Sequence, residues 1–475
     1  MRRLGSEPAV KPAPRVGAVF SFDEKTVLRG GWGLYFSPWN YPAAGTTGWG
    51  QIGYSATTSI PQPSGIPTVT MSNPFPNGLT QTSGNTLGLL TGTGSDITFI
   101  DPNKGAPRVQ QYSVDLQREF PGGVSVSVGY TGLTGTNMDW GSSININQID
   151  PKYQSQLTTT TTLVPNPFFG VAAAGSTLAS RSTIEIGQLL RPFPQFLNVN
   201  MSQSTGAHSQ YHAGIIQLRK RTAGFWGGNF SYTYSRLNDN QFGASNYYSS
   251  APGLQNNYTV VPGSPYYNPD QEYGRSLLDS PHKIVIAPTF NLPFGQGKKY
   301  LTSGVGSALL GGWSVTPVAT FQAGFPLGVS QNITGTAFLY GGTQRPNIVP
   351  GQDILTAGDI TDRITATTCA TGCTTDNLYY NKNAFVNSAL NQFGNAPRTL
   401  GVYSPWRNNI DLSVSKNVKT GGGTSASVRL EVLNMFNIVQ WAAPASSSFG
   451  NSSFGQINTQ ANNMRMVQFT LRFQF

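Results

Sequence analysis

Apolar and polar residues alternate one by one at the end of this 475-residue chain. In the closing segment MRMVQFTLRFQF, the apolar positions are Val467, Phe469, Leu471, Phe473 and Phe475, and polar residues separate them. Successive side chains of a β-strand point to opposite faces, so this period of two predicts a strand with one apolar and one polar face. The same alternation recurs in 124–130, 230–235, 410–415 and 427–432. The chain is therefore predicted to be all-β.

The connections between the predicted strands are alternately short and long. The predicted strands are Val16–Phe22, Thr26–Phe36, Val109–Phe120, Val124–Asn137, Tyr211–Arg221, Trp226–Leu237, His282–Leu292, Trp313–Phe321, Asn408–Val418, Thr424–Phe436 and the terminal segment. Compact soluble domains rarely contain several long loops without structure of their own. Outer-membrane barrels, in contrast, have short periplasmic turns and long external loops. We therefore expect a transmembrane antiparallel meander barrel rather than a soluble sandwich.

Aromatic residues near the predicted strand ends fit this interpretation. Outer-membrane barrels carry aromatic girdles at both membrane interfaces. Taken singly, each of these side chains is more often an ordinary packing aromatic. The candidates are Trp32, Tyr35, Phe36, Trp226, Trp313 and Phe321.

Composition excludes several other classes of protein. Only 11% of the residues are charged, against about 25% in typical soluble domains. Intrinsic disorder requires high charge and few aromatics, whereas this chain is 11% aromatic. The net charge of +10 is spread along the chain, with its densest cluster at 219–221. We predict no nucleic-acid partner, because such binding needs basic residues gathered in a patch. The sequence contains neither an apolar run long enough for a transmembrane helix nor a signal peptide at its start.

The sequence offers little for catalysis or metal binding. His208 and His212 would lie about 13 Å apart on a strand, too far to share one metal unless a flexible loop brings them together. GWGQIG at 48–53 has the letters of a dinucleotide motif but lacks the strand and helix that the motif requires. We expect no enzyme activity, no metal and no cofactor. Cys369 and Cys373 have too few companions for a zinc site, and a small disulfide loop is the preferred interpretation.

Several long segments are similar to one known family. YGRSLLDSPHKIVIAPTFNLPFGQGKKY (273–300), GGWSV (311–315), VQQYSVDLQREFPGGVSVSVGYTGLTG (109–135), NAPRTLGVYSPWRNNIDLSVSKNV (395–418), RLEVLNMFNIVQW (429–441) and FGQI (454–457) carry the similarity. Together they resemble the C-terminal half of TonB-dependent receptors of the Oar-like group. His282, just after Pro281, falls where the resemblance places a strand start, which implies a structural role.

The resemblance implies a location, partners and a function. The location would be the bacterial outer membrane, and the chain would contact outer-membrane lipid. The function would be ligand uptake through a plugged barrel, with the TonB complex engaged by an N-terminal plug that this chain lacks. An alternative function is a structural or adhesive surface protein that binds glycans or peptides through its loops. The ligand is not readable from the sequence.

In such families an aromatic last residue after alternating apolar positions is the signal that the barrel-assembly machinery reads. Phe475, Phe473, Leu471, Phe469 and Val467 match that signal. The other interpretation is an ordinary amphipathic last strand.

The number of predicted strands indicates that residues 1–475 form only a partial barrel. Single-chain bacterial barrels have an even number of strands, and plugged transporters have about 22. The strands predicted here are odd in number and amount to about half of such a barrel. We expect the remaining strands, the plug and a signal peptide to lie upstream, and the isolated chain to misfold, aggregate or associate.

Overall fold

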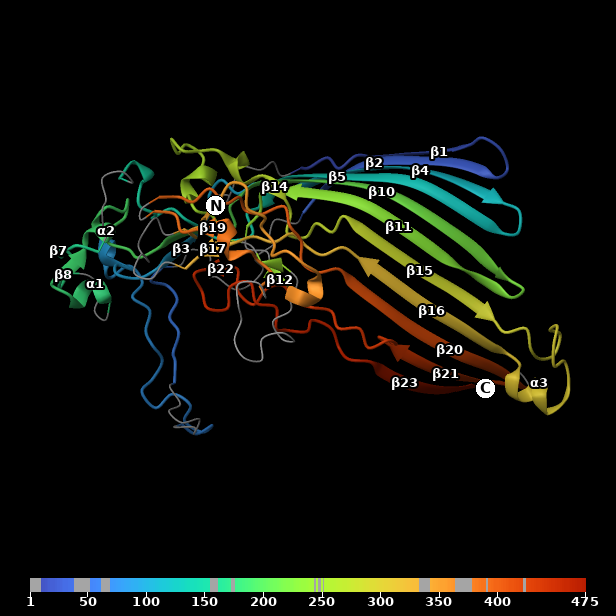
Figure 1. Cartoon of the computed structure of the whole chain (residues 1–475). Coiled ribbons are helices and arrows are strands. Elements are labelled where there is room, and N and C mark those ends of the chain that lie inside the picture. The colour runs from blue at the N-terminus through green and yellow to red at the C-terminus, as the bar shows by residue number, and fades with distance from the viewer. Residues whose placement is uncertain are drawn as a thin grey trace.

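The computed structural model describes residues 10–37, 52–60, 69–153, 161–171, 176–242, 245–246, 249–250, 252–332, 342–363, 378–389, 392–421 and 424–475. One large antiparallel sheet dominates these ranges, and its long strands pair in chain order, as Figure 1 shows. This arrangement confirms the predicted meander. Its strands are β1 (Arg15–Ser21), β2 (Thr26–Phe36), β4 (Arg108–Phe120), β5 (Val124–Asp139), β10 (Thr205–Ala223), β11 (Trp226–Asp239), β15 (His282–Asn291), β16 (Trp313–Gln322), β20 (Arg407–Gly421), β21 (Thr424–Leu433) and β23 (Met466–Gln474).

All the predicted strands are present. Most of their ends differ from the prediction by one to three residues, and the ends of β21 and β10 differ for a clear physical reason. β21 stops at Leu433, before the predicted Phe436, because Asn434 takes a left-handed conformation with φ of 50° and turns the chain. β10 begins at Thr205 rather than Tyr211, because its first residues pair with the end of β5 across two register shifts. Within the described ranges, the short β14 (Gly274–Arg275) also pairs with β11.

One face of the sheet is largely apolar. Residues that pair directly on neighbouring antiparallel strands point to the same face. Many of the side chains on this face are exposed, including Phe20, Val128 and Ile216. A continuous exposed apolar surface is what an outer-membrane barrel presents to lipid. One row of it runs through Phe20, Leu28, Leu116, Val128, Ile216, Tyr232, Ile284 and Phe321.

The opposite face is largely polar. In a row displaced by one residue, β4, β5, β10 and β11 contribute Gln117, Ser127, Gln217 and Ser231, while β2 and β15 contribute Val27 and Val285. Arg29 on β2 also points to this face, and its Nη1 donates to Gln117 Oε1 at 3.1 Å. The two faces differ as the lipid side and the aqueous lumen of a barrel differ. We therefore call them the lipid face and the luminal face.

Aromatic and basic side chains border the lipid face near the short turns. Lys220 lies over the ring of Trp226, with Nζ 4.8 Å from the ring centroid, and Lys416 lies over Trp313 at 5.6 Å. Such side chains keep their charge in water while their stems cover apolar surface. Arg219 has the opposite parity to Lys220 and points to the luminal face, and Arg221, beyond it, contacts Glu119 at 3.7 Å. The basic cluster at 219–221 is therefore split between two faces.

A second aromatic border lies at the other end of the strands. His282 pairs with Tyr234, and its ring stacks on Trp406 with 6.0 Å between centroids. The length of the stretch from Trp226 to Tyr234 matches the about 9–11 residues that a tilted strand needs to cross a bilayer. The predicted place of Tyr35 in an aromatic girdle was wrong. Tyr35 has the opposite parity to Trp32 and lies on the luminal face over Gly33.

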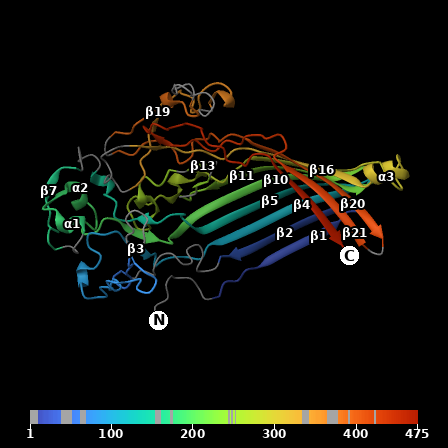
Figure 2. The same ribbon diagram turned by 90° about the horizontal axis from the view of Figure 1, so that it is seen from below.

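The two ends of the sheet differ strongly. The short turns lie together at one end, where the β15–β16 connection also carries the helix α3 (Gly304–Leu310). The long connections gather at the opposite end, on the left of Figure 1. Figure 2 shows the same division and the curvature of the sheet. This asymmetry confirms the expected alternation of short and long connections.

The long connections contain structure that the sequence patterns did not predict. Short strands form small sheets there, and two further helices, α1 (Thr177–Ser180) and α2 (Ile186–Leu189), each have 4 residues. None of the helices in the described ranges has the length and apolar character needed to cross a membrane. One small sheet has three strands, in the order β3 (Ile97–Ile100), β9 (Val199–Ser202) and β6 (Ile144–Asn145). The others described are strand pairs: β7 (Leu163–Pro165) with β8 (Thr183–Glu185), β12 (Ser245–Asn246) with β13 (Ser249–Ser250), β17 (Ser330–Gln331) with β22 (Ser448–Phe449), and β18 (Asn347–Ile348) with β19 (Phe385–Val386).

The lipid face generates a direct test of the fold. Leu218 lies in a central row of that face, between Val126 and Phe230, and its neighbour Gln217 lies on the luminal face between Ser127 and Ser231. We predict that Leu218→Lys destabilises the membrane-inserted protein by about 2–4 kcal/mol, whereas Gln217→Lys has little effect. Urea titration of both variants in lipid vesicles measures the difference. Equal losses would contradict the assignment of the two faces.

Candidate functional site

The long connections pack into a folded assembly with apolar cores of its own. One core joins the β16–β20 connection to the β21–β23 connection, where the Tyr380 and Phe454 rings stack with 5.1 Å between centroids. A second core joins the β5–β10 connection to the β11–β15 connection, where Trp140 stacks on Phe242 at 5.8 Å. Surface loops seldom bury such side chains, so this end of the protein holds a defined shape.

Arg398 is the central polar residue of this assembly. Its side chain is 3% exposed, and Nη2 contacts Asp239 Oδ1 at 2.7 Å, where β11 ends. Nη1 donates to Gln241 O at 2.8 Å, and Nε donates to Glu272 O at 3.1 Å. One guanidinium thus binds the β16–β20 connection to the β11–β15 connection. A buried arginine is stable only when paired and hydrogen-bonded in this way.

A second buried arginine joins the same two connections. Arg345 Nη1 contacts Glu272 Oε2 at 2.9 Å, and the two side chains are 2% and 7% exposed. Arg345 Nη2 also donates to Gly253 O at 3.0 Å. Nearby, Gln255 Nε2 donates to Gly394 O at 3.0 Å, and Gln255 Oε1 accepts from Gly394 N at 3.1 Å. The contacts of Arg398, Arg345 and Gln255 define what we call the loop clamp.

A polar cavity of about 390 Å³ opens on the luminal face below this assembly. Asp411, Asn409 and Gln322 line it from the sheet, and Arg407 lies over the Phe325 ring with 4.8 Å between its guanidinium carbon and the ring centroid. Amides supply half of the remaining lining, and Leu433, Met464 and Met466 add apolar surface. Such a surface can exchange hydrogen bonds with a polar ligand or with another polar protein surface. The remaining polar residues that line it are Thr320, Asn434, Gln440, Asn462 and Asn463.

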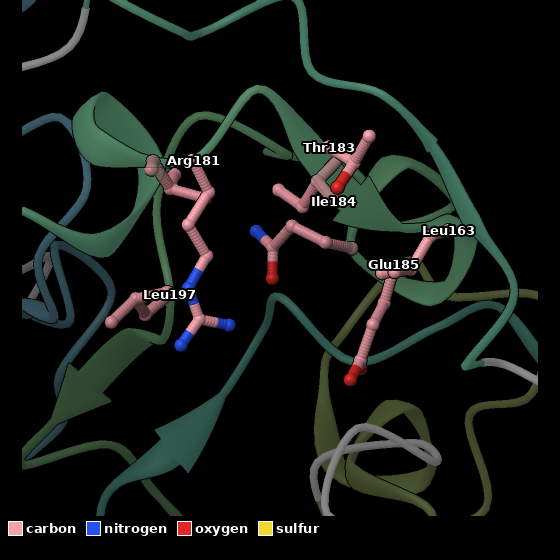
Figure 3. A pocket seen from close by; sticks show the side chains of 8 residues that line it. Leu163, Arg181, Thr183, Ile184, Glu185 and Leu197 are labelled. Carbon is pink, nitrogen blue, oxygen red and sulfur yellow. The ribbon is translucent and has the colours of Figure 1, made fainter.

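A smaller cavity of about 90 Å³ lies far from the sheet, between β7, β8 and α2. Figure 3 shows Arg181 and Leu197 on one side of it and Thr183, Ile184 and Glu185 on the other. Gln188, 2% exposed, donates through Nε2 to Pro194 O and Phe196 O at 2.8 and 2.7 Å. Its Oε1 has no hydrogen-bond partner among the described residues. The cavity therefore combines apolar walls with a buried hydrogen-bond acceptor.

Burial alters the acid–base properties of two tyrosines in the assembly. It raises the pKa of Tyr258 to about 12, and the Tyr258 hydroxyl donates to Gln148 O at 2.5 Å. Burial also raises the pKa of Tyr379 to about 12. Both phenols therefore stay neutral hydrogen-bond donors at physiological pH.

The predicted terminal signal residues are exposed on and beyond the edge strand. Val467, Phe469, Leu471 and Phe473 are each at least 52% exposed and share one face of β23. Phe475 follows the last residue of β23 and is fully exposed. Cys369 and Cys373 lie outside the described residues, so their disulfide stays a prediction.

The three histidines have separate partners. His208 and His212 both lie in β10, although the predicted strand began at Tyr211 and contained His212 alone, and the structure does not bring the two together. His212 Nδ1 lies 2.6 Å from Tyr130 Oη, while His208 Nε2 lies 3.3 Å from Asp270 Oδ1. His282 begins β15, where the resemblance placed a strand start, and its Nδ1 lies 3.0 Å from Tyr232 Oη.

Sequence reasoning missed the loop clamp. A signal was present, because arginine and acidic residues within charge-poor loops are unusual and point to buried pairs. Nothing local, however, indicates that Arg398 meets Asp239, since the two are 159 positions apart.

The loop clamp generates a stability prediction. Arg398→Met would leave Asp239 buried without its cation, which typically costs about 3–5 kcal/mol. We expect limited chymotrypsin digestion to cut at Tyr267, within the β11–β15 connection, at least tenfold faster in this variant, with the far-ultraviolet circular dichroism of the sheet unchanged.

Arg221→Met is the matched control for this test. Arg221 is 79% exposed and lies 3.7 Å from Glu119, so its loss should cost about 0–1 kcal/mol. Equal cleavage rates in the two variants would contradict the role of the clamp.

Three solved structures are similar to this chain over most of its length, at low sequence identity. The ferripyoverdine receptor of the outer membrane of Pseudomonas aeruginosa, bound to ferripyoverdine, is 10% identical with a TM-score of 0.36, over 97% of this chain and 32% of that one. The outer membrane transporter YddB from Escherichia coli is 7% identical with a TM-score of 0.39, over 94% and 38%. The ferric citrate transporter FecA, unliganded, is 9% identical with a TM-score of 0.36, over 98% and 38%.

The chain spans about a third of the length of these solved structures. No curated protein matches the sequence significantly. The sequence profile of a family described as "Outer membrane beta barrel domain" matches residues 2–468. That match covers nearly the whole chain and agrees with the meander, its lipid face and its unequal ends. The chain belongs to the outer membrane beta barrel domain family, and its place is the bacterial outer membrane.

Proposed function

We propose that this chain is the C-terminal part of a TonB-dependent outer-membrane receptor, which takes up a ligand when its barrel and plug are complete. The observation that carries the proposal is the folded loop assembly above a polar luminal cavity. A binding surface that is already ordered loses little conformational entropy when a ligand binds. The loop clamp and the two apolar cores supply that order. The role we propose is binding and passage, without catalysis.

The sheet edges support a partial barrel. In the described part of the chain, β1 pairs with β2 and β23 pairs with β21, and each has one neighbour. Open sheet edges are not tolerated in lipid, because their backbone groups would lack hydrogen-bond partners. We infer that further strands complete the barrel in the whole protein, and that the plug lies with them. The Oar-like subgroup also stays a prediction.

Binding to TonB tests the proposed function without knowledge of the ligand. The full-length gene product should bind the purified periplasmic domain of TonB, because the plug carries the contact segment. The 475-residue chain alone, carried in the same detergent, serves as the control and should not bind. A full-length protein that does not bind TonB but makes cells adhere to glycan-coated surfaces would contradict the proposed uptake function. That result would favour an adhesive anchor.

The terminal aromatic residue generates a second prediction. We propose that Phe475, with the alternate apolar residues before it, is read by the barrel-assembly machinery. Phe475 is fully exposed, so its deletion removes almost no buried area. We nevertheless expect deletion to lower the amount of assembled protein in the outer membrane of living cells severalfold, measured by membrane fractionation.

Phe20→Ala is the control for that deletion. Phe20 is 59% exposed on the lipid face of β1, the other edge strand. This variant should assemble close to the parental level, since no terminal signal is altered. Equal assembly of the deletion, the control and the parent would show that Phe475 is an ordinary residue.

A further inference from the structure

A large cavity lies on the lipid face, at the end of the sheet where the long connections gather. Its volume is about 830 Å³. His282 and Trp406 line it with stacked rings, and Asn408 lines it from β20. Asn408 pairs with Phe321, which in turn pairs with Ile284 of the lipid face. The alternate residues Arg407 and Asn409 line the luminal cavity instead. β20 therefore separates two cavities, one on each face of the barrel wall.

The β16–β20 connection forms the roof of this cavity. Leu355, Ile360, Arg363 and Tyr379 of that connection all line it. Figure 2 shows the connection around β19 outside the curve of the sheet, as a roof over the lipid face requires. Long loops of outer-membrane barrels lie on the external side. The cavity therefore lies at the headgroup level of the outer leaflet, continuous with the apolar surface below.

The described lining combines aromatic rings with the cation of Arg363. Tyr379, Tyr403 and Trp441 add to His282 and Trp406, and none of the described lining residues is an aspartate or a glutamate. Burial keeps the Tyr379 phenol neutral, since its pKa is raised to about 12, and its hydroxyl donates to Tyr403 O. Aromatic faces of this kind can pack against sugar rings, while tyrosine and tryptophan favour the membrane interface.

Arg363 is the cation of this cavity. Its Nη2 donates to Gly358 O at 2.7 Å, and its buried Nε has no hydrogen-bond partner among the described residues. Asp362 lies on the same turn but instead accepts from Asp359 N at 3.1 Å, and it does not line the cavity. A guanidinium that still has N–H donors available favours a phosphate, which it can bind through two parallel hydrogen bonds.

We infer that this cavity binds the headgroup of a phosphorylated glycolipid of the outer leaflet. Arg363 would hold a phosphate, the aromatic rings would pack against the sugars, and the acyl chains would follow the lipid face of β15, β16 and β20. Two observations select a lipid rather than a soluble phosphosugar: the cavity is on the lipid face, and its lining continues into the apolar belt. This site is independent of ligand uptake through the lumen.

Binding of defined lipids to the full-length protein tests the inference. The probes are diphosphorylated lipid A, its dephosphorylated form, and inorganic phosphate as a soluble competitor. Native mass spectrometry of the detergent-solubilised protein counts bound lipid, and titration gives the affinity. We expect lipid A to bind at least tenfold more tightly than its dephosphorylated form, since hydrogen bonds between charged groups are the strong ones.

Variants locate the site. Arg363→Gln should weaken lipid A binding at least tenfold, and Trp406→Ala should weaken both forms of the lipid. Arg429→Gln is the matched control, because Arg429 faces the lumen on β21 and its loss removes the same charge. Normal heat-modifiable migration verifies that each variant is folded. Equal affinity for the two lipid forms, full affinity in Arg363→Gln, or displacement of lipid A by millimolar phosphate would overturn the inference.

Discussion

The backbone of a chain in lipid must find every hydrogen bond within the protein, and the rest of this structure follows from that requirement. An antiparallel ladder meets it by pairing each strand with the strands on both sides. Because direct partners share a face, the ladder also transmits the alternation of one strand to the next. Phe20 on β1 and Phe321 on β16 belong to the same apolar row, although they are far apart in the sequence.

The ladder also explains why functional features lie where they do. Turns on one side are short, apart from the β15–β16 connection with α3, so little protein gathers there. The long connections on the other side are free to fold on one another and to project over either face of the wall. The two cavities beside β20 illustrate this, since Trp406 and Arg407 are adjacent residues that line opposite cavities.

The strands were predictable from the sequence because their signal is local. Alternation needs only the residues of one segment, and tight turns such as Pro121-Gly122-Gly123 define where a segment ends. The strand ends were less predictable, because the start of β10 depends on pairing with β5. The loop assembly was not predictable at all. The contact between Arg398 and Asp239, like the stacking of Tyr380 on Phe454, depends on distant parts of the chain meeting in space.

The scarcity of charge makes the few buried charges informative. In a chain with 11% charged residues, the largely apolar lipid face accounts for much of the shortage, although Arg118 pairs with Val126 on that face. A buried ion pair rarely adds stability over a well-packed apolar pair, so stability alone is a weak reason to keep one. What a guanidinium offers is several hydrogen bonds in fixed directions, and Arg398 uses them on carbonyls of the β11–β15 connection. Apolar packing alone would leave the relative orientation of these loops loosely specified. The two arginines of the loop clamp therefore hold the long connections in one defined arrangement. Their role lies in the shape of the loop surface and not in the barrel wall.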